Sequence, residues 1–231
     1  MPAGRPRGFD QDEALDRALE LFWRNGYEGT SLADLTEAMG VSRPSLYAAF
    51  GDKGELFRTV LARYVAGPGA YVRRALARLQ AADAIRTLLL DAAAAMTMPD
   101  QPPGCLVVHG ALACAEEGAA ARDLLVAERL NRQAAIRARL ERAAGEGDLV
   151  EGADVVLLTE YVMTTLHGLA VQALGGASRE ALTAVAELAV RALALDGPKA
   201  PEPGKRGKTP GGRSSKRAKP DDQLTQIAMD L

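Results

Sequence analysis

The residues best suited to bind a polyanion gather in one short stretch, SLADLTEAMGVSRPSLYAAFGDK, which spans residues 31–53. Its second half combines small side chains with hydroxyls, a phenol and a guanidinium. Small side chains let a helix lie deep in the DNA major groove, and polar ones donate hydrogen bonds to phosphates and base edges. We therefore predict that this stretch binds double-stranded DNA. The residues expected on its exposed face are Ser42, Arg43, Ser45, Tyr47 and Ala48.

Two short helices separated by a tight turn would present these groups. Ser31 is the expected N-cap of the first helix, with Asp34 as its capping-box partner. Gly40 ends that helix, and Val41 is an apolar plug in the turn. A supporting helix, a glycine turn and an exposed second helix together predict a helix-turn-helix.

The second helix is expected to begin at Ser42 and to end near Phe50. Pro44 falls in its first turn, where a missing N–H costs nothing. Leu46 and Phe50 are four residues apart and would anchor the helix from behind.

The flanking sequence predicts helices on both sides. Asp10 is the expected N-cap of the preceding helix, with Glu13 as capping-box partner and Gly26 as the stop. A following helix is expected to open at Asp52, and the glycines and proline of residues 67–69 should break or bend it.

A longer segment, GTSLADLTEAMGVSRPSLYAAFGDKGELF, preceded in register by ALELFWRNGY, resembles the TetR/AcrR family of repressors over about residues 9–64. The glycine turn, V-S, L-Y, Phe50 and G-D-K carry this resemblance. It implies an N-terminal helix-turn-helix domain followed by a helical ligand-binding domain. Two recognition helices of a dimer would then read half-sites spaced by about one turn of DNA, ~34–36 Å.

The resemblance also implies roles for single positions. The residues it places at base edges or phosphates are Ser42, Arg43, Pro44, Ser45, Tyr47 and Lys53. Thr30 or Ser31 would hold a phosphate at a helix start, and Arg5 and Arg7 resemble a basic arm laid in the minor groove. The sequence departs from the family pattern at Gly54, which costs helix stability of up to ~1 kcal/mol, and at Ala48 and Ala49, which remove a polar contact.

The rest of the composition predicts an all-α chain. Apolar residues make up 48% of the 231 residues, aromatic ones only 4%, and helical patterns continue to residue 195. We predict an N-terminal three-helix helix-turn-helix DNA-binding domain plus a C-terminal helical bundle for ligand binding and dimerisation. The expected divisions are a flexible basic arm (1–9), the DNA-binding domain (10–66), the bundle (67–197) and a disordered basic tail (198–231).

Charge distribution and the lack of targeting signals predict where DNA is contacted and in which compartment the protein works. The net charge is −2, and the eight Lys/Arg against four Asp/Glu after residue 197 leave the remainder at −6, so any DNA contact must be local. The sequence has no secretion signal and no run of about 18 apolar residues, which predicts a cytoplasmic protein without a membrane span.

The residues that could sense an effector lie in the second half. Cys105 follows a Pro/Gly loop at a predicted helix start, where a thiol becomes more reactive. Some relatives with Gly-Cys-Leu at this place sense electrophiles or oxidants with the cysteine, and a buried packing role is the alternative. His109 is four residues on, but two ligands make no zinc site, so we predict neither metal nor cofactor. An apolar pocket is expected from Met96, Met98, Val108, Leu112, Tyr161, Met163 and His167, with Cys105 and His109 as sensor candidates.

The last two predicted helices, 154–174 and 178–195, are candidates for a homodimer bundle. Their apolar faces are Val155, Leu158, Val162, Leu166 and Leu169 on one helix, and Leu182, Val185, Leu188, Ala189 and Ala192 on the other. Part of each face must serve the protomer's own core, and the rest could form a four-helix bundle with a partner.

Two other functions stay open at this stage. A constitutive structural DNA-binding protein would grip phosphates with the basic tail, lack a preferred sequence and lose affinity steeply with salt. A small helical enzyme is the weaker alternative, because no Ser/His/Asp order, glycine phosphate loop or carboxylate pair stands out.

Overall fold

The computed structural model describes residues 9–110, 118–193 and 195, all within one compact unit, Met1–Pro198. Every regular element in these ranges is a helix, which confirms the all-α prediction. The predicted contacts Arg5, Arg7 and Leu112, together with Cys114 and the basic segment 198–231, lie outside the described residues.

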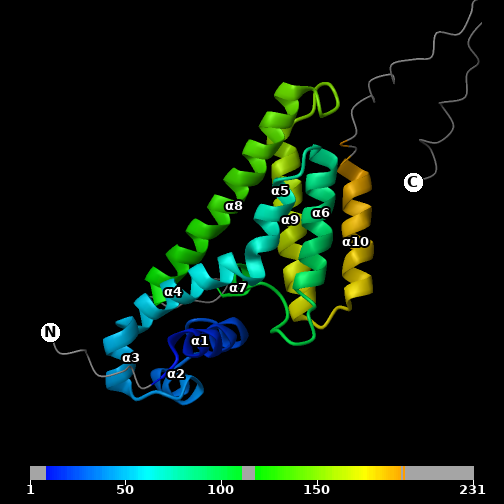
Figure 1. Cartoon of the computed structure of the whole chain (residues 1–231). Coiled ribbons are helices and arrows are strands. Elements are labelled where there is room, and N and C mark those ends of the chain that lie inside the picture. Colours follow the sequence, from blue (N-terminus) through cyan, green and yellow to red (C-terminus); the bar gives the residue numbers. More distant parts are fainter. Residues whose placement is uncertain (1–8, 111–117, 194, 196–231) are drawn as a thin grey trace, which may run out of the picture. The chain divides into compact units, whose positions relative to one another are not determined.

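Four helices make the N-terminal end of the unit (Figure 1): α1 (Gln11–Asn25), α2 (Leu32–Met39), α3 (Arg43–Phe50) and α4 (Lys53–Ala66). Each begins at the N-cap that the sequence predicts, where a side-chain oxygen accepts backbone N–H groups that the helix leaves unpaired. These N-caps are Asp10, Ser31, Ser42 and Asp52.

Two details of capping differ in outcome. Ser31 and Asp34 form the expected capping box, with Asp34 N–H donating to Ser31 Oγ (3.1 Å) and Ser31 N–H donating to Asp34 (2.8 Å). The prediction that the Glu13 side chain accepts the Asp10 N–H is wrong, because the Glu13 carboxylate pairs with Arg17 one turn along the helix (2.5 Å). Asp10 caps α1 alone, accepting from the N–H groups of Asp12 and Glu13.

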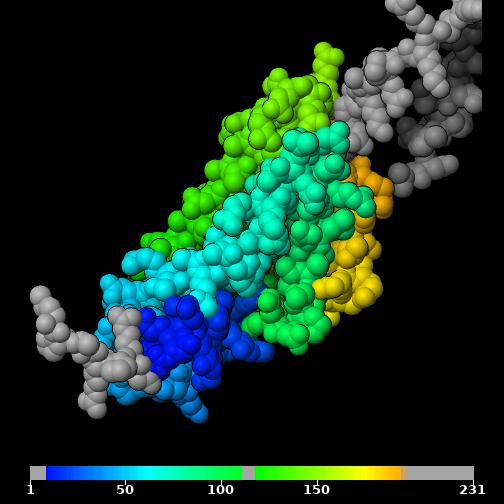
Figure 2. Space-filling model, in the orientation of Figure 1, coloured from blue at the N-terminus to red at the C-terminus, as the bar shows by residue number. Residues whose placement is uncertain are grey.

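The C-terminal part is built from one 3-10 turn and six helices within the described residues: η1 (Pro68–Ala70), α5 (Tyr71–Leu76), α6 (Ala81–Ala95), α7 (Leu106–His109), α8 (Ala119–Glu146), α9 (Val155–Leu174) and α10 (Arg179–Leu193). The turn at η1 is the break predicted after α4. Helices α6, α9 and α10 pack side by side, and α8 packs against α9 (Figure 1). In Figure 2 the surface of α8 runs beside that of the α4–α5 segment.

An aromatic cluster joins α1 to α4. Phe22 and Phe57 are fully buried and meet edge to face with ring centroids 5.0 Å apart. Tyr27 packs on both rings, at 6.1 and 5.1 Å. Edge-to-face rings add specific attraction to the area they bury, so this cluster fixes the helix-turn-helix on the first half of α4.

The second half of α4 makes further links to α1. Trp23 and Tyr64 meet edge to face at 4.8 Å. Arg63 donates to both carboxylate oxygens of Asp16 (2.6 and 2.9 Å) and to Asp12 (2.8 Å). These bonds hold the pKa of Asp16 below its ordinary value and raise the pKa of Arg63. Helix α4 is therefore held to α1 along most of its length.

Helix α9 is the one described helix long and apolar enough to cross a membrane by length and composition. Its buried residues, such as Val162, Leu166 and Leu169, pack inside the helical bundle, whereas Leu157 and Val171 are exposed. A core helix that is also apolar on its outer face gives the same composition. The packing therefore makes α9 a bundle helix with a second apolar face.

We expect Leu46→Ala to destabilise the protein, because Leu46 is the one fully buried residue of α3 and its removal leaves a cavity. The expected loss is about 2–5 kcal/mol of unfolding free energy, measured by urea denaturation. The matched control is Tyr47→Ala, one residue along, which is 48% exposed and should change stability by no more than ~0.5 kcal/mol. Equal losses in the two variants would contradict the packing described.

Candidate nucleic-acid interface

Helix α3 presents a polar face away from the core. Leu46 is fully buried and Phe50 is half-buried, as predicted for the two anchors, while Arg43, Pro44 and Tyr47 are exposed. The helix carries no acidic residue. This face is narrow, free of negative charge and held from behind, as a major-groove helix requires.

The start of α3 is organised by two serines. Ser42 Oγ accepts the Ser45 N–H (3.3 Å) and lies 2.9 Å from Ser45 Oγ. Ser42 is exposed and Ser45 is half-buried. Each hydroxyl keeps capacity for a further bond, so both predicted contacts remain available near the exposed end of the helix.

Lys53 stands at the first position of α4, and its Nζ lies 4.2 Å from the centre of the Tyr27 ring. Partial burial lowers the pKa of Lys53, while the carboxylates of Glu28 and Asp34 act to raise it. The stacking on Tyr27 is a cation–π contact. This contact restricts the position of the Lys53 ammonium beside the helix-turn-helix.

The alternative of Thr30 as a phosphate contact is not supported. Its side chain is buried, and its hydroxyl donates to the Gly26 carbonyl (2.8 Å) just past the end of α1. The hydroxyl is therefore used inside the protein. Ser31 is exposed; its N–H donates to Asp34 and its Oγ accepts the Asp34 N–H, so the donor it can offer a phosphate is its hydroxyl proton.

Phe9 marks the start of the described chain beside α3. Its ring packs on Phe50 with centroids 6.2 Å apart, and it borders a hollow of about 330 Å³ together with Val41, Ser45 and Ala48. The segment that leads into α1 therefore passes beside α3. Arg5 and Arg7 precede this point and stay predictions.

The two sensor candidates, Cys105 just before α7 and His109 at its end, have different partners. Cys105 is fully buried and its Sγ accepts a hydrogen bond from the Tyr64 hydroxyl (3.3 Å). His109 Nε2 lies 2.7 Å from the Trp23 carbonyl of α1. Burial, with Cys105 close by, raises the pKa of Tyr64, so the phenol stays protonated and donates. The described residues hold no cluster of three or more metal-ligating side chains.

The apolar pocket predicted from helix faces is not assembled as expected. Met96, Val108 and Met163 are buried in the core, whereas Met98 and Tyr161 are exposed, at 42% and 41%. Tyr161 and Met163 are two residues apart on α9 and so point in different directions. His167 is half-buried on the same helix.

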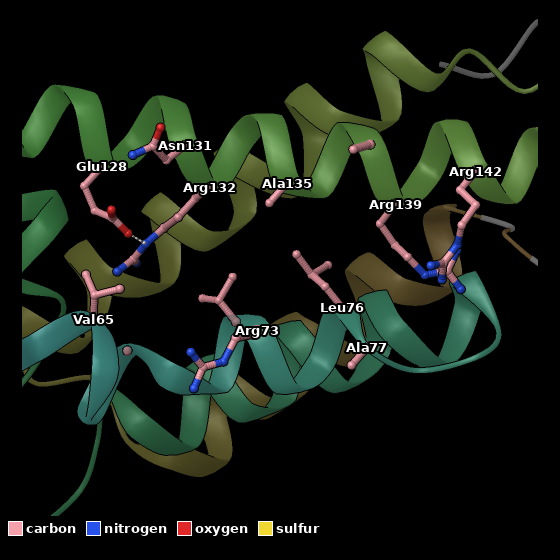
Figure 3. A pocket seen from close by; sticks show the side chains of 13 residues that line it. Val65, Arg73, Leu76, Ala77, Glu128, Asn131, Arg132, Ala135, Arg139 and Arg142 are labelled. Atoms are coloured by element: carbon pink, nitrogen blue, oxygen red, sulfur yellow. Dashed lines mark hydrogen bonds and ion pairs between the residues drawn. The ribbon is translucent and has the colours of Figure 1, made fainter. Parts of the chain in front are cut away.

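A groove of about 500 Å³ lies elsewhere, between α8 and the α4–α5 segment (Figure 3). None of the residues predicted for the pocket lines it. Its walls combine apolar side chains with arginines, among them Val65, Leu76, Arg132 and Arg139. These residues were not predicted, because the arginines of α8 have the sequence pattern of an ordinary solvated helix face.

Comparisons with known proteins agree with this geometry. Residues 14–60 match the family described as bacterial regulatory proteins, tetR family. The chain is 34% identical to the HTH-type transcriptional repressor ComR of Escherichia coli K12 over 81% of its length and 90% of that protein. It is 31% identical to the repressor BdcR of the same strain, over 82% and 92%.

Solved structures give the same result. A cysteine mutant of the TetR family transcriptional regulator CifR, complexed with 26-base-pair double-strand operator DNA, is 46% identical with a TM-score of 0.78. The match covers 81% of this chain and 99% of that one. A TetR-type regulator from Rhodococcus sp. RHA1 is 42% identical with a TM-score of 0.57, over 80% and 100%.

A three-helix unit with an anchored, exposed third helix, joined through α4 to a helical bundle, defines a helix-turn-helix DNA-binding regulator. The chain belongs to the TetR family of bacterial regulatory proteins. It is a transcriptional regulator and not an enzyme.

We expect stability to fall between about pH 7.5 and pH 5.5. Burial lowers the pKa of both His109 and His167 below the ordinary 6.5. The hydrogen bond to the Trp23 carbonyl acts to raise the pKa of His109, whereas the positive charges of Arg129 and Arg132 lower that of His167 further. The unfolded chain therefore takes up protons first as the pH falls, which favours unfolding.

Urea midpoints at the two pH values measure this effect. The double variant His109→Gln and His167→Gln should show a smaller change in midpoint, because these are the two histidines of the chain. A wild-type midpoint that is equal at both pH values would contradict the burial of the imidazoles.

Proposed function

We propose that the chain is a sequence-specific repressor that binds operator DNA as a homodimer through α3. The observation that carries this proposal is the anchoring of α3 by the buried Leu46, which leaves Arg43 and Tyr47 exposed on a helix free of acids. The roles of Ser42, Arg43, Pro44 and Ser45 at base edges or phosphates, and of Tyr47 and Lys53 at phosphates, belong to the proposal. The relatives named as repressors and the operator complex of CifR support it.

The proposed homodimer uses the outer faces of α9 and α10. Among the apolar residues predicted for this role, Val162, Leu166, Leu169, Leu182 and Ala189 are buried within the protomer. The exposed large apolar side chains on the two helices are Val156, Leu157, Tyr161, Val171, Leu174, Val185 and Leu188. So many exposed apolar groups on adjacent helices are typical of a surface covered by a partner, and two such hairpins make a four-helix bundle.

Release of the operator by a small molecule completes the proposal. A ligand bound in the C-terminal part would favour a tilt of α4 that changes the spacing of the two α3 helices. Affinity would fall by the ratio of the ligand's affinities for the two states. Because Cys105 is fully buried, a small molecule is a better effector than a reactive species. We place the protein in the cytoplasm, where such a regulator meets its operator.

We expect Tyr47→Ala and Lys53→Ala each to weaken operator binding by about tenfold or more, because each removes a phosphate contact. The operator is first selected from random duplexes with the purified full chain, and binding is then measured by gel shift across a salt series. Lys53→Ala should also lower the salt slope by about one. The control is Arg137→Ala, an exposed arginine of α8. Normal operator binding by a protein that carries both Tyr47→Ala and Lys53→Ala would overturn the proposed interface. If the selection returns no preferred sequence, a structural DNA-binding protein is favoured instead.

We expect Leu188→Glu to convert the dimer to monomers, because it places a charge in the proposed α9–α10 bundle, where Leu188 is 60% exposed on the protomer. Sedimentation equilibrium should give half the wild-type mass, and operator affinity should fall with it. The control is Leu79→Glu, which changes an apolar residue that is 91% exposed between α5 and α6. A dimer unaffected by Leu188→Glu would place the interface on another surface.

A further inference from the structure

The position of α3 that points most directly away from the core is occupied by an alanine. Successive residues of an α-helix are turned by about 100° around its axis, so Ala48 points about 180° away from the midpoint of the two anchors, Leu46 and Phe50. Ala48 is exposed, whereas Leu46 is fully buried and Phe50 is half-buried. The centre of the exposed face of α3 is therefore a methyl group.

The residue one turn before Ala48 is apolar as well. Pro44 lies four residues earlier and is exposed, so it stands beside Ala48 on the same face of α3. Polar side chains lie to either side of this pair, with Tyr47 exposed on one flank and Ser45 half-buried on the other. A helix that enters the major groove with this face presents apolar atoms at its centre and hydrogen-bonding atoms at its sides.

The surface that adjoins Ala48 has the same character. The hollow of about 330 Å³ beside α3 is lined by residues without a charged side chain, namely Phe9, Gly40, Val41, Ser42, Ser45, Ala48 and Ala49. Its two hydroxyls, on Ser42 and Ser45, are 2.9 Å apart and bond to each other. They keep capacity for a further bond at the rim, and the other side chains of the wall make only apolar contacts.

The major-groove edges of the four bases differ in what they offer such a surface. Guanine, adenine and cytosine present hydrogen-bond donors or acceptors, whereas thymine presents a C5-methyl group beside its O4 acceptor. A purine nitrogen or a cytosine amino group placed against Ala48 would lose its hydrogen bond to water without gaining another. The thymine methyl group loses no hydrogen bond there and is removed from water by the contact.

We propose that Ala48 is a specificity-determining residue that contacts the C5-methyl group of one thymine in each operator half-site, with Pro44 extending the same apolar surface. The inference rests on the proposed function, because it requires α3 to lie in the major groove, and it adds the base that α3 reads by apolar contact. The lack of a polar side chain at position 48 is then itself a source of base preference.

The test removes the methyl group from the DNA. Deoxyuridine lacks the C5-methyl group of thymidine and pairs with adenine in the same way, so it replaces each thymidine of the selected operator in turn, at matching positions of both half-sites. Affinity of the full chain is measured by gel shift. One matching pair of replacements should weaken binding by about fourfold for each half-site, the effect of exposing one buried methyl group.

A matched pair of variants assigns the effect to one side chain. Ala48→Gly removes the methyl group from α3, so deoxyuridine at the sensitive position should then weaken binding by less than about twofold. Ala49→Gly makes the same change at the next residue, with the same loss of helix propensity, and should keep the full effect. Ala48→Ser, which puts a hydroxyl at the same place, should likewise show no preference for thymidine. Urea denaturation checks that each variant is folded.

Wild-type binding to the unmodified operator is measured in the same gels, which separates the two proposals. Normal binding without any thymidine that is sensitive to methyl removal would overturn the role of Ala48 and leave the proposed function intact. The full deoxyuridine effect in the Ala48→Gly protein would do the same, because the methyl group would then contact another residue. Failure of the wild-type protein to select any sequence would overturn both proposals.

Discussion

The packing of α4 against α1 is the interaction on which the rest of the structure depends. Phe57 in the first half of α4 packs on Phe22, and Tyr64 in the second half packs on Trp23. Because both contacts are buried, the helix-turn-helix cannot move without α4. Arg63 reinforces the joint through Asp12 and Asp16, although exposed ion pairs such as these add little to stability by themselves.

This joint gives α4 two different neighbours at its ends. Lys53 opens the helix beside the DNA-binding face, and Val65 closes it beside the groove on α8. A ligand can shift the equilibrium between two α4 positions only by as much as it prefers one of them. A groove whose walls come from α8 on one side and from α4–α5 on the other satisfies that requirement, since its width depends on where α4 lies.

The sequence predicted the helix-turn-helix well because local signals determine it. N-cap residues, the turn at Gly40 and the four-residue spacing of Leu46 and Phe50 act within one or two helical turns. The sequence did not reveal that the Thr30 hydroxyl donates to the Gly26 carbonyl, because this bond depends on how the chain leaves α1. The N-cap preference of a threonine does not reveal which acceptor lies nearby.

The bundle was predictable only as a set of helices. Periodicity indicates that Met163 and Leu166 are buried, but it does not say which helices cover them. The predicted pocket therefore combined core residues with the exposed Met98 and Tyr161. For the same reason the sequence did not show which apolar residues of α9 lie in the protomer's core and which are exposed, because a core helix and a helix covered by a second protomer have the same composition.

The arginines of α8 show where sequence reasoning could have gone further. Arg137 has an acid four residues away at Glu141 and is half-exposed, as expected for a solvated helix face. Arg139 has alanines at both such positions, Ala135 and Ala143, and so has no acidic neighbour one turn away. In the structure Arg139 is buried and donates to the carbonyls of Arg78 and Leu79. The absence of an acid one turn away therefore distinguishes the buried Arg139 from the exposed Arg137, and Arg139 is among the residues that line the groove.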